Sequence, residues 1–219
     1  MSVEIPAIAP RRAWRTSALG VLLALAFFSL PIGSWVHEDA ALANRLVFEL
    51  IVWAWVAGIL LYVVRVERRD LSSIGFRALG IRDGIIAVLA GILILVLLAL
   101  ILLVVFPALH WSESSQDASI LSLPYWLNVL IVVRAAVSEE ILFRGYPIER
   151  LEELTGSRAL AGAVSCAVFT LDHISFWGWH HIFIAGSAGA ALTVLYLWRR
   201  NIWVNMIAHF MVDAAAFLA

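Results

Sequence analysis

The sequence predicts an all-α, polytopic membrane protein: a bundle of about seven transmembrane helices with its N-terminus inside and its C-terminus outside. Apolar residues make up 63% of the 219-residue chain and charged residues only 14%, whereas soluble domains are about 45–50% apolar and about 25% charged. Apolar runs close to the ~20 residues needed to cross hydrocarbon recur along the chain. Arginines gather in alternate connections between these runs.

Each expected span is an apolar run bounded by polar residues. The first could be mistaken for a signal peptide, but its apolar core is longer than such a peptide has, so we expect it to be retained. The fifth run is short, and the fourth and seventh contain polar residues. In chain order the expected spans are 16–36, 45–64, 83–107, 122–143, 158–173, 182–198 and 201–218.

The arginines orient the bundle. They precede the first span, fill the connection at 65–82, and follow the fourth and sixth spans, whereas Arg45 is alone among the opposite connections. Basic residues mark cytoplasmic connections, so we expect a cytoplasmic N-terminus. The connection at 65–82 has room for a short interfacial helix. A net charge of −1 gives no reason to expect a nucleic acid partner.

Three segments differ in content. Residues 1–15 are an expected cytoplasmic segment, 16–119 hold spans without a recognisable motif, and 120–219 carry the chemistry. The single cysteine, Cys166, lies in an apolar run and indicates neither a disulfide nor a thiolate metal site.

Charge inside the fourth span is the strongest functional signal. Glu139 and Glu140 close an apolar run, although an ionisable residue within a span costs at least ~2.5–3.5 kcal/mol. His173, His209 and Asp213 lie in two further spans. The helical rise places Glu139, His173 and His209 roughly 12–22 Å below the cytoplasmic face. A buried active site is the favoured interpretation; carboxylates and imidazoles solvated at the interface are the alternative.

Helical spacing separates the two glutamates. Glu140 and Arg144 are four residues apart and share a face, so we expect them to pair. Glu139 points about 100° away and is free to face a cavity. His209 and Asp213 share the same spacing, which suits either an oriented imidazole or a purely structural pair.

Other residues carry weaker expectations. Pro147 should kink the helix just below the glutamates. Arg134 is a buried cation with Asp172 and Asp213 as candidate partners. His180 and His181, beside tryptophans, are expected at the outer interface.

The motifs Glu139-Glu140-x-x-x-Arg144, Phe169-x-x-x-His173 and His209-x-x-x-Asp213 resemble those of the CAAX-processing and bacteriocin-processing (CPBP, or Abi) intramembrane proteases. The resemblance covers roughly 120–219. It departs at Asp213, where the family more often has asparagine. An asparagine can donate a hydrogen bond to an oxyanion, and an ionised aspartate cannot.

The resemblance implies hydrolysis of peptide bonds in membrane-anchored or lipid-bearing substrates, within the lipid bilayer of the cell (inner) membrane, at a site open to the cytoplasm. Glu139 would activate a water, His173 would hold and polarise it, and His209 would stabilise the oxyanion. No cofactor is required by this interpretation, although Glu139, His173 and His209 could also ligate a divalent metal such as zinc. Two other functions stay open: a non-catalytic immunity or scaffold protein, and a proton-coupled transporter. The implied catalytic residues are Glu139, Glu140, His173, His209 and Asp213, supported by Arg144 and Phe169.

Overall fold

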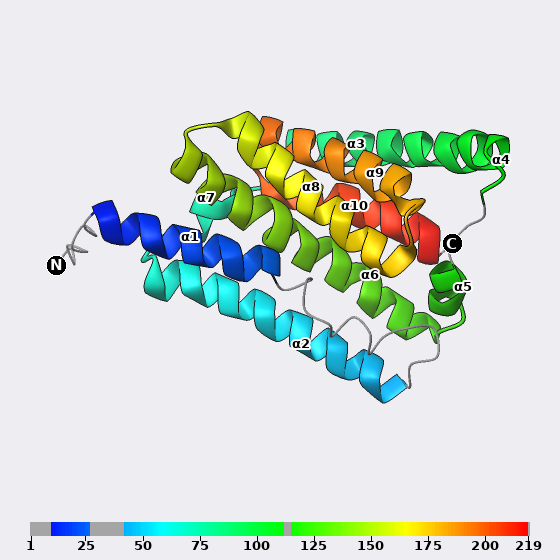
Figure 1. Cartoon of the computed structure of the whole chain (residues 1–219), viewed down its shortest axis with the longest axis horizontal. Helices are drawn as coiled ribbons and strands as arrows, with labels where there is room; N and C mark the ends of the chain where they lie inside the picture. Colours follow the sequence, from blue (N-terminus) through cyan, green and yellow to red (C-terminus); the bar gives the residue numbers. More distant parts are fainter. Residues whose placement is uncertain (1–9, 27–41, 112–114, 219) are drawn as a thin grey trace.

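The computed structural model describes residues 10–26, 42–111 and 115–218, and over these ranges every regular element is a helix (Figure 1). This confirms the expected fold class. A helix occupies each of the seven apolar runs. The second half of the first expected span, 27–36, lies outside the described residues.

The helices vary in regularity. Three of them, α2, α3 and α6, continue directly into a π-helical turn. The elements in chain order are α1 (Pro10–Ala26), α2 (Leu42–Leu61), η3 (Tyr62–Val66), η4 (Leu71–Ile74), α3 (Ile81–Leu100), η5 (Ile101–Val105), α4 (Phe106–Ala108), α5 (Ser115–Leu121), α6 (Tyr125–Glu139), η6 (Glu140–Gly145), α7 (Tyr146–Thr155), α8 (Arg158–Trp177), α9 (His181–Arg199) and α10 (Ile202–Phe217).

Four helical stretches among the described residues are long and apolar enough to cross a membrane: Leu42–Val66, Ile81–Ala108, Arg158–Trp177 and His181–Arg199. The described part of α1 and the whole of α10 are apolar but shorter. The α6 segment carries the arginine and glutamates of the fourth run. The apolar helices indicate an integral membrane protein, with fewer clear spans than the seven apolar runs.

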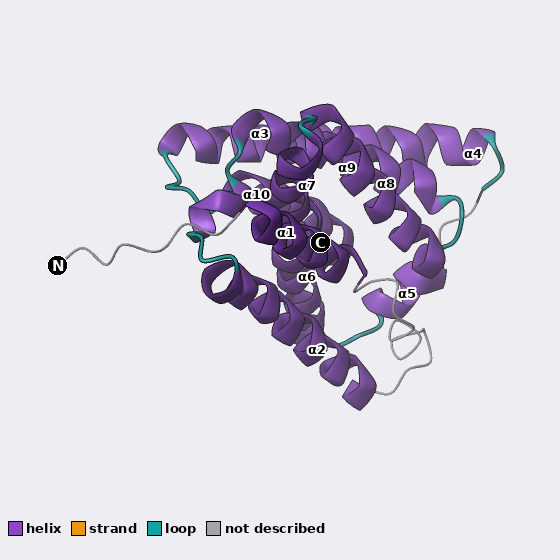
Figure 2. Cartoon of the chain, turned by 60° about the vertical axis from the view of Figure 1, so that its left-hand side comes forward, coloured by secondary structure: helices purple, strands orange, loops and turns teal. Residues whose placement is uncertain are grey.

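α6 and α10 lie side by side at the centre of the bundle (Figures 1 and 2). α10 also packs against α3, α8 packs against α9, and α2 packs against α6. α7 lies between α1 and α8. The helices that carry the candidate site residues therefore share one interior.

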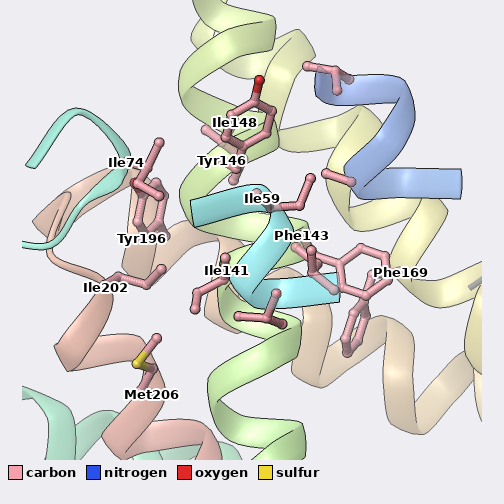
Figure 3. Packing of buried hydrophobic residues seen from close by; sticks show 14 of the residues in the cluster. Ile59, Ile74, Ile141, Phe143, Tyr146, Ile148, Phe169, Tyr196, Ile202 and Met206 are labelled. Atoms are coloured by element: carbon pink, nitrogen blue, oxygen red, sulfur yellow. The ribbon is translucent and has the colours of Figure 1, made fainter. Parts of the chain in front are cut away.

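Apolar side chains hold η6 in place from several directions. Phe143 meets Phe169 of α8 edge to face, with ring centroids 5.1 Å apart. Ile141, Tyr196 and Met206 belong to the same buried cluster (Figure 3). Because this cluster joins η6 to α8, α9 and α10, it fixes the backbone next to the glutamates.

The connection at 67–80 folds back into the bundle. The short helix expected there is one 3₁₀ turn, and its Ile74 is fully buried instead of lying at the membrane interface. Gly75 has φ +91°, and its carbonyl accepts a 2.8 Å hydrogen bond from the Ile202 amide. A Cβ at Gly75 would lie 2.7 Å from the Tyr196 hydroxyl, so only glycine fits. The connection thereby anchors the start of α10.

Arg150, one of the arginines that follow the fourth expected span and mark the cytoplasmic side, is interior, as is Arg144. The side chains of Arg144 and Arg150 are fully buried. Arg150 pairs with Glu67 at 2.7 Å, and the Tyr146 hydroxyl donates to the same carboxylate. Both buried guanidiniums are paired, Arg144 with Glu140 and Arg150 with Glu67.

Candidate active site

The backbone changes geometry where the glutamates lie. α6 ends at Glu139, a π-helical turn spans Glu140–Gly145, and Pro147 falls in the first turn of α7. The distortion expected at Pro147 therefore lies in the turn before it. Because proline has no N–H, the Phe143 carbonyl four residues earlier loses its usual donor. The Ser165 hydroxyl of α8 donates to that carbonyl. Such π turns occur frequently at functional sites.

Glu140 is fully buried and its carboxylate is saturated with donors. Oε1 lies 2.9 Å from Arg144 Nη1 and 2.8 Å from His209 Nδ1. Oε2 accepts a 3.0 Å hydrogen bond from the Asn205 side chain. The expected pairing with Arg144 is present, and these contacts leave Glu140 little freedom to move.

Arg144 is held on its other side by Phe169. The guanidinium carbon lies 4.0 Å from the Phe169 ring centroid, a cation–π contact, and Nη2 donates to the Gly189 carbonyl at 3.4 Å. A Cβ at Gly189 would come within 2.8 Å of the Phe169 ring. Close approach of α9 to α8 thus depends on this glycine.

Glu139 has different neighbours. Its Oε1 lies 3.5 Å from Arg134 Nη1, whereas its Oε2 lies 3.8 Å from His173 Nε2 and 3.9 Å from His209 Nε2. The carboxylate is largely buried, with 8% of the residue exposed. The structure brings together on three helices the residues that the sequence placed only at similar depth.

Hydrogen bonds determine which way both imidazoles face. His173 Nδ1 lies 2.9 Å from the Phe169 carbonyl, and His209 Nδ1 lies 2.8 Å from Glu140. A carbonyl and a carboxylate only accept, so we assign a proton to each Nδ1. Each Nε2 is consequently presented to Glu139.

Asp213 approaches the same imidazole nitrogen as Glu139. Its Oδ2 lies 3.5 Å from His209 Nε2, the i,i+4 contact expected from the sequence. Its side chain is 21% exposed, against 7% for His209. Asp213 is therefore at the more open edge of the site.

The sequence interpretation missed two residues that contact the site, Glu49 and Asn205. Arg134 Nε lies 3.2 Å from each carboxylate oxygen of Glu49 on α2, so neither Asp172 nor Asp213 is its direct partner. Glu49 is a lone acidic residue in an apolar run, the same signal that identified Glu139. Asn205 is four residues before His209 on the same helical face. That spacing was the available signal.

The two histidines expected at the outer interface, His180 and His181, have different surroundings. His180 packs within an aromatic group, with its ring tilted against those of Trp179 and Trp111 at centroid distances of 3.9 and 4.6 Å. The His181 ring lies parallel to that of His173 at 6.1 Å. His181 thus contacts the site, which the interface expectation did not include.

The donor set does not fit a metal centre as arranged. No group of three or more His, Cys, Asp or Glu side chains in the described part of the chain is placed to hold a metal ion. The 3.8 and 3.9 Å separations between Glu139 Oε2 and the two imidazole nitrogens exceed the roughly 3.4 Å expected between neighbouring ligands of a tetrahedral zinc with bonds of ~2.0–2.1 Å. We therefore derive no step through a metal.

Comparison with known families bears on the same residues. Residues 121–215 match the model of a family described as type II CAAX prenyl endopeptidase Rce1-like. This part of the chain is similar to the Rce1-like endopeptidases. It contains all three motifs, from Glu139 to Asp213, and the match confirms the resemblance to CPBP proteases. No curated protein and no solved structure matches the chain.

The matched range covers just under half of the chain and begins at the last residue of α5, after α3. The match supports intramembrane endopeptidase activity in general, of the CAAX protease type II. Glu49 lies outside the matched range, although it contacts Arg134 inside it.

Proposed function

We propose that this protein is an intramembrane endopeptidase in which Glu139 activates the hydrolytic water. The observation that carries the proposal is the placement of Glu139 Oε2 between His173 Nε2 and His209 Nε2, at 3.8 and 3.9 Å. Glu140 has its oxygens engaged by three donors, so it supports the site and Glu139 is the available base.

The separation of Glu139 from His173 suits one water between them. At 3.8 Å the two atoms are too far apart for a direct hydrogen bond, whereas one water with hydrogen bonds of about 2.8 Å reaches both. The water donates one proton to Glu139 Oε2 and the other to the lone pair on His173 Nε2. Its oxygen then attacks the scissile carbonyl carbon, and Glu139 takes the first proton as general base.

His209 is the proposed oxyanion donor. When both ring nitrogens are protonated, Nδ1–H donates to Glu140 and Nε2–H donates to the oxygen of the tetrahedral intermediate. Asp213 orients that ring and, while ionised, donates nothing itself. Collapse of the intermediate breaks the C–N bond, and Glu139 returns its proton to the leaving amine.

The proposed substrates carry their own membrane anchor, as CAAX-type prenylated proteins or peptide precursors do. The support is the burial of Glu139 and His209 within apolar helices, and the family's description as a CAAX prenyl endopeptidase. We place the protein in the cell (inner) membrane with the site open to the cytoplasm.

Purified protein in proteoliposomes should cleave a lipid-anchored peptide faster than the same peptide without its anchor. Equal rates on both peptides would contradict the anchored-substrate proposal. A scaffold, or a transporter that uses the same buried charges for proton transfer, would cleave neither peptide.

A further inference from the structure

Arg134 connects the first half of the chain to the proposed base. Its Nε lies 3.2 Å from both Glu49 oxygens, and its Nη1 lies 3.5 Å from Glu139 Oε1. The three residues belong to α2 and α6 and are 4%, 9% and 8% exposed for Glu49, Arg134 and Glu139. One buried guanidinium is therefore shared between two carboxylates.

The two carboxylate oxygens of Glu139 have different neighbours. Arg134 contacts Oε1, whereas both imidazoles contact Oε2. A carboxylate without this cation is free to turn about its last side-chain bond. Since near-attack geometry depends on sub-ångström placement, such rotation would separate the water from its base.

We propose that Glu49 and Arg134 are positioning residues for Glu139, a role that rests on the function proposed above. Glu49 holds the guanidinium on α2, and the guanidinium holds Oε1 so that Oε2 faces His173 and His209. α2 lies outside the range that matches the Rce1-like family, so the proposed site extends beyond the matched range into α2.

Glu49 matters because it limits how strongly Arg134 binds Glu139. Without Glu49, the buried cation has Glu139 as its remaining ion-pair partner among the described contacts. A fully paired Glu139 is a poorer proton acceptor. Removing either positioning residue should therefore lower turnover, for different reasons.

A neutral double variant separates positioning from stability. Replacing a whole buried ion pair is often neutral for stability, whereas breaking it is strongly destabilising. Glu49→Gln and Arg134→Met alone should each lower the Tm, and Glu49→Gln combined with Arg134→Met should recover part of that loss, because Glu139 still loses its guanidinium partner. With a lipid-anchored peptide, the double variant should lose at least about tenfold in kcat with KM changed by less than about twofold.

A second pair of variants keeps the test informative if the double variant does not fold. Glu49→Asp and Arg134→Lys keep both charges. The first shortens the acidic side chain, and the second replaces the planar guanidinium by a single ammonium group. Each should fold with lowered kcat, and Arg134→Lys should retain more activity than Arg134→Met. The matched control is Glu67→Gln with Arg150→Met, a buried pair at 2.7 Å that forms no ion pair with Glu139 among the described residues; its folded fraction should turn over normally.

Wild-type kcat in a folded double variant, or in both conservative variants, would overturn the positioning role. If Glu139→Gln is inactive in the same assay, the proposed function survives that result. If the wild type cleaves nothing, or Glu139→Gln cleaves normally, the proposed function fails and the positioning role fails with it.

Discussion

Glu140 and Arg144 form a buried ion pair one turn apart, with 2.9 Å between Oε1 and Nη1 and no exposure of either side chain. Glu139, the preceding residue, faces two imidazoles instead. Neighbouring glutamates of the same chain thus occupy different environments, because consecutive helical residues point about 100° apart. The predicted effects of replacing them differ accordingly.

Glu140→Gln should act mainly by lowering the stability of the protein, because Glu140 supports the site and is not the proposed base. It leaves the Arg144 guanidinium without an ionised partner, and breaking a buried pair costs about 3–5 kcal/mol. Arg144→Met should have a similar effect, and the double variant should recover part of the loss. Thermal melting and yield in detergent measure this; a double variant no more stable than either single variant would contradict the pairing argument.

Ser165→Ala should destabilise the protein by about 1–3 kcal/mol, because the Phe143 carbonyl loses its side-chain donor. The matched control is Ser138→Ala. Ser138 is equally buried, but its hydroxyl has no hydrogen-bond partner among the described residues. Its loss should leave the Tm unchanged or raise it. Equal destabilisation by the two changes would show that Ser165 does not stabilise the π-helical turn.

The sequence was sufficient for the helices and for three residues that the structure brings together. Apolar runs indicated the seven helical segments, and helical rise placed Glu139, His173 and His209 at comparable depth. Spacing also predicted the Glu140–Arg144 and His209–Asp213 contacts, because i,i+4 neighbours share a face. These are local rules that operate within one helix.

Contacts between distant helices required the structure. The spacing of residues within α6 does not tell which face of α2 packs against it, so the sequence did not predict the Glu49–Arg134 pair. Arg150 is among the arginines that follow the fourth span and so predict a cytoplasmic connection, yet it is paired with Glu67 and completely buried. The π-helical turn receives a hydrogen bond from Ser165 of α8, which Pro147 alone does not reveal.

Reporter fusions test the predicted orientation. Fusions at Arg77, His110 and Ala219 should read cytoplasmic, external and external, because arginines concentrate in alternate connections. Arg77 and His110 are exposed, so insertion there should disturb packing little. A cytoplasmic reading at Ala219 would contradict seven crossings and, with them, the estimated depth of the site.

Chelation tests the metal-free mechanism. Because Glu139, His173 and His209 are not spaced as zinc ligands would be, activity should survive prolonged treatment with a strong chelator. Metal analysis of active protein should find much less than one equivalent of zinc. Loss of activity on chelation, restored by a stoichiometric divalent cation, would replace the glutamate mechanism with a metal-dependent one.

Turnover of a lipid-anchored peptide by Glu139→Gln, measured with thermal melting, tests the central claim most directly. The amide keeps the shape of the side chain but cannot take the proton from water, so the rate should fall by at least ~10²-fold while the protein stays folded. Glu140→Gln should instead lose stability. A well-folded Glu139→Gln variant that cleaves at the wild-type rate would contradict the assignment of Glu139 as the base.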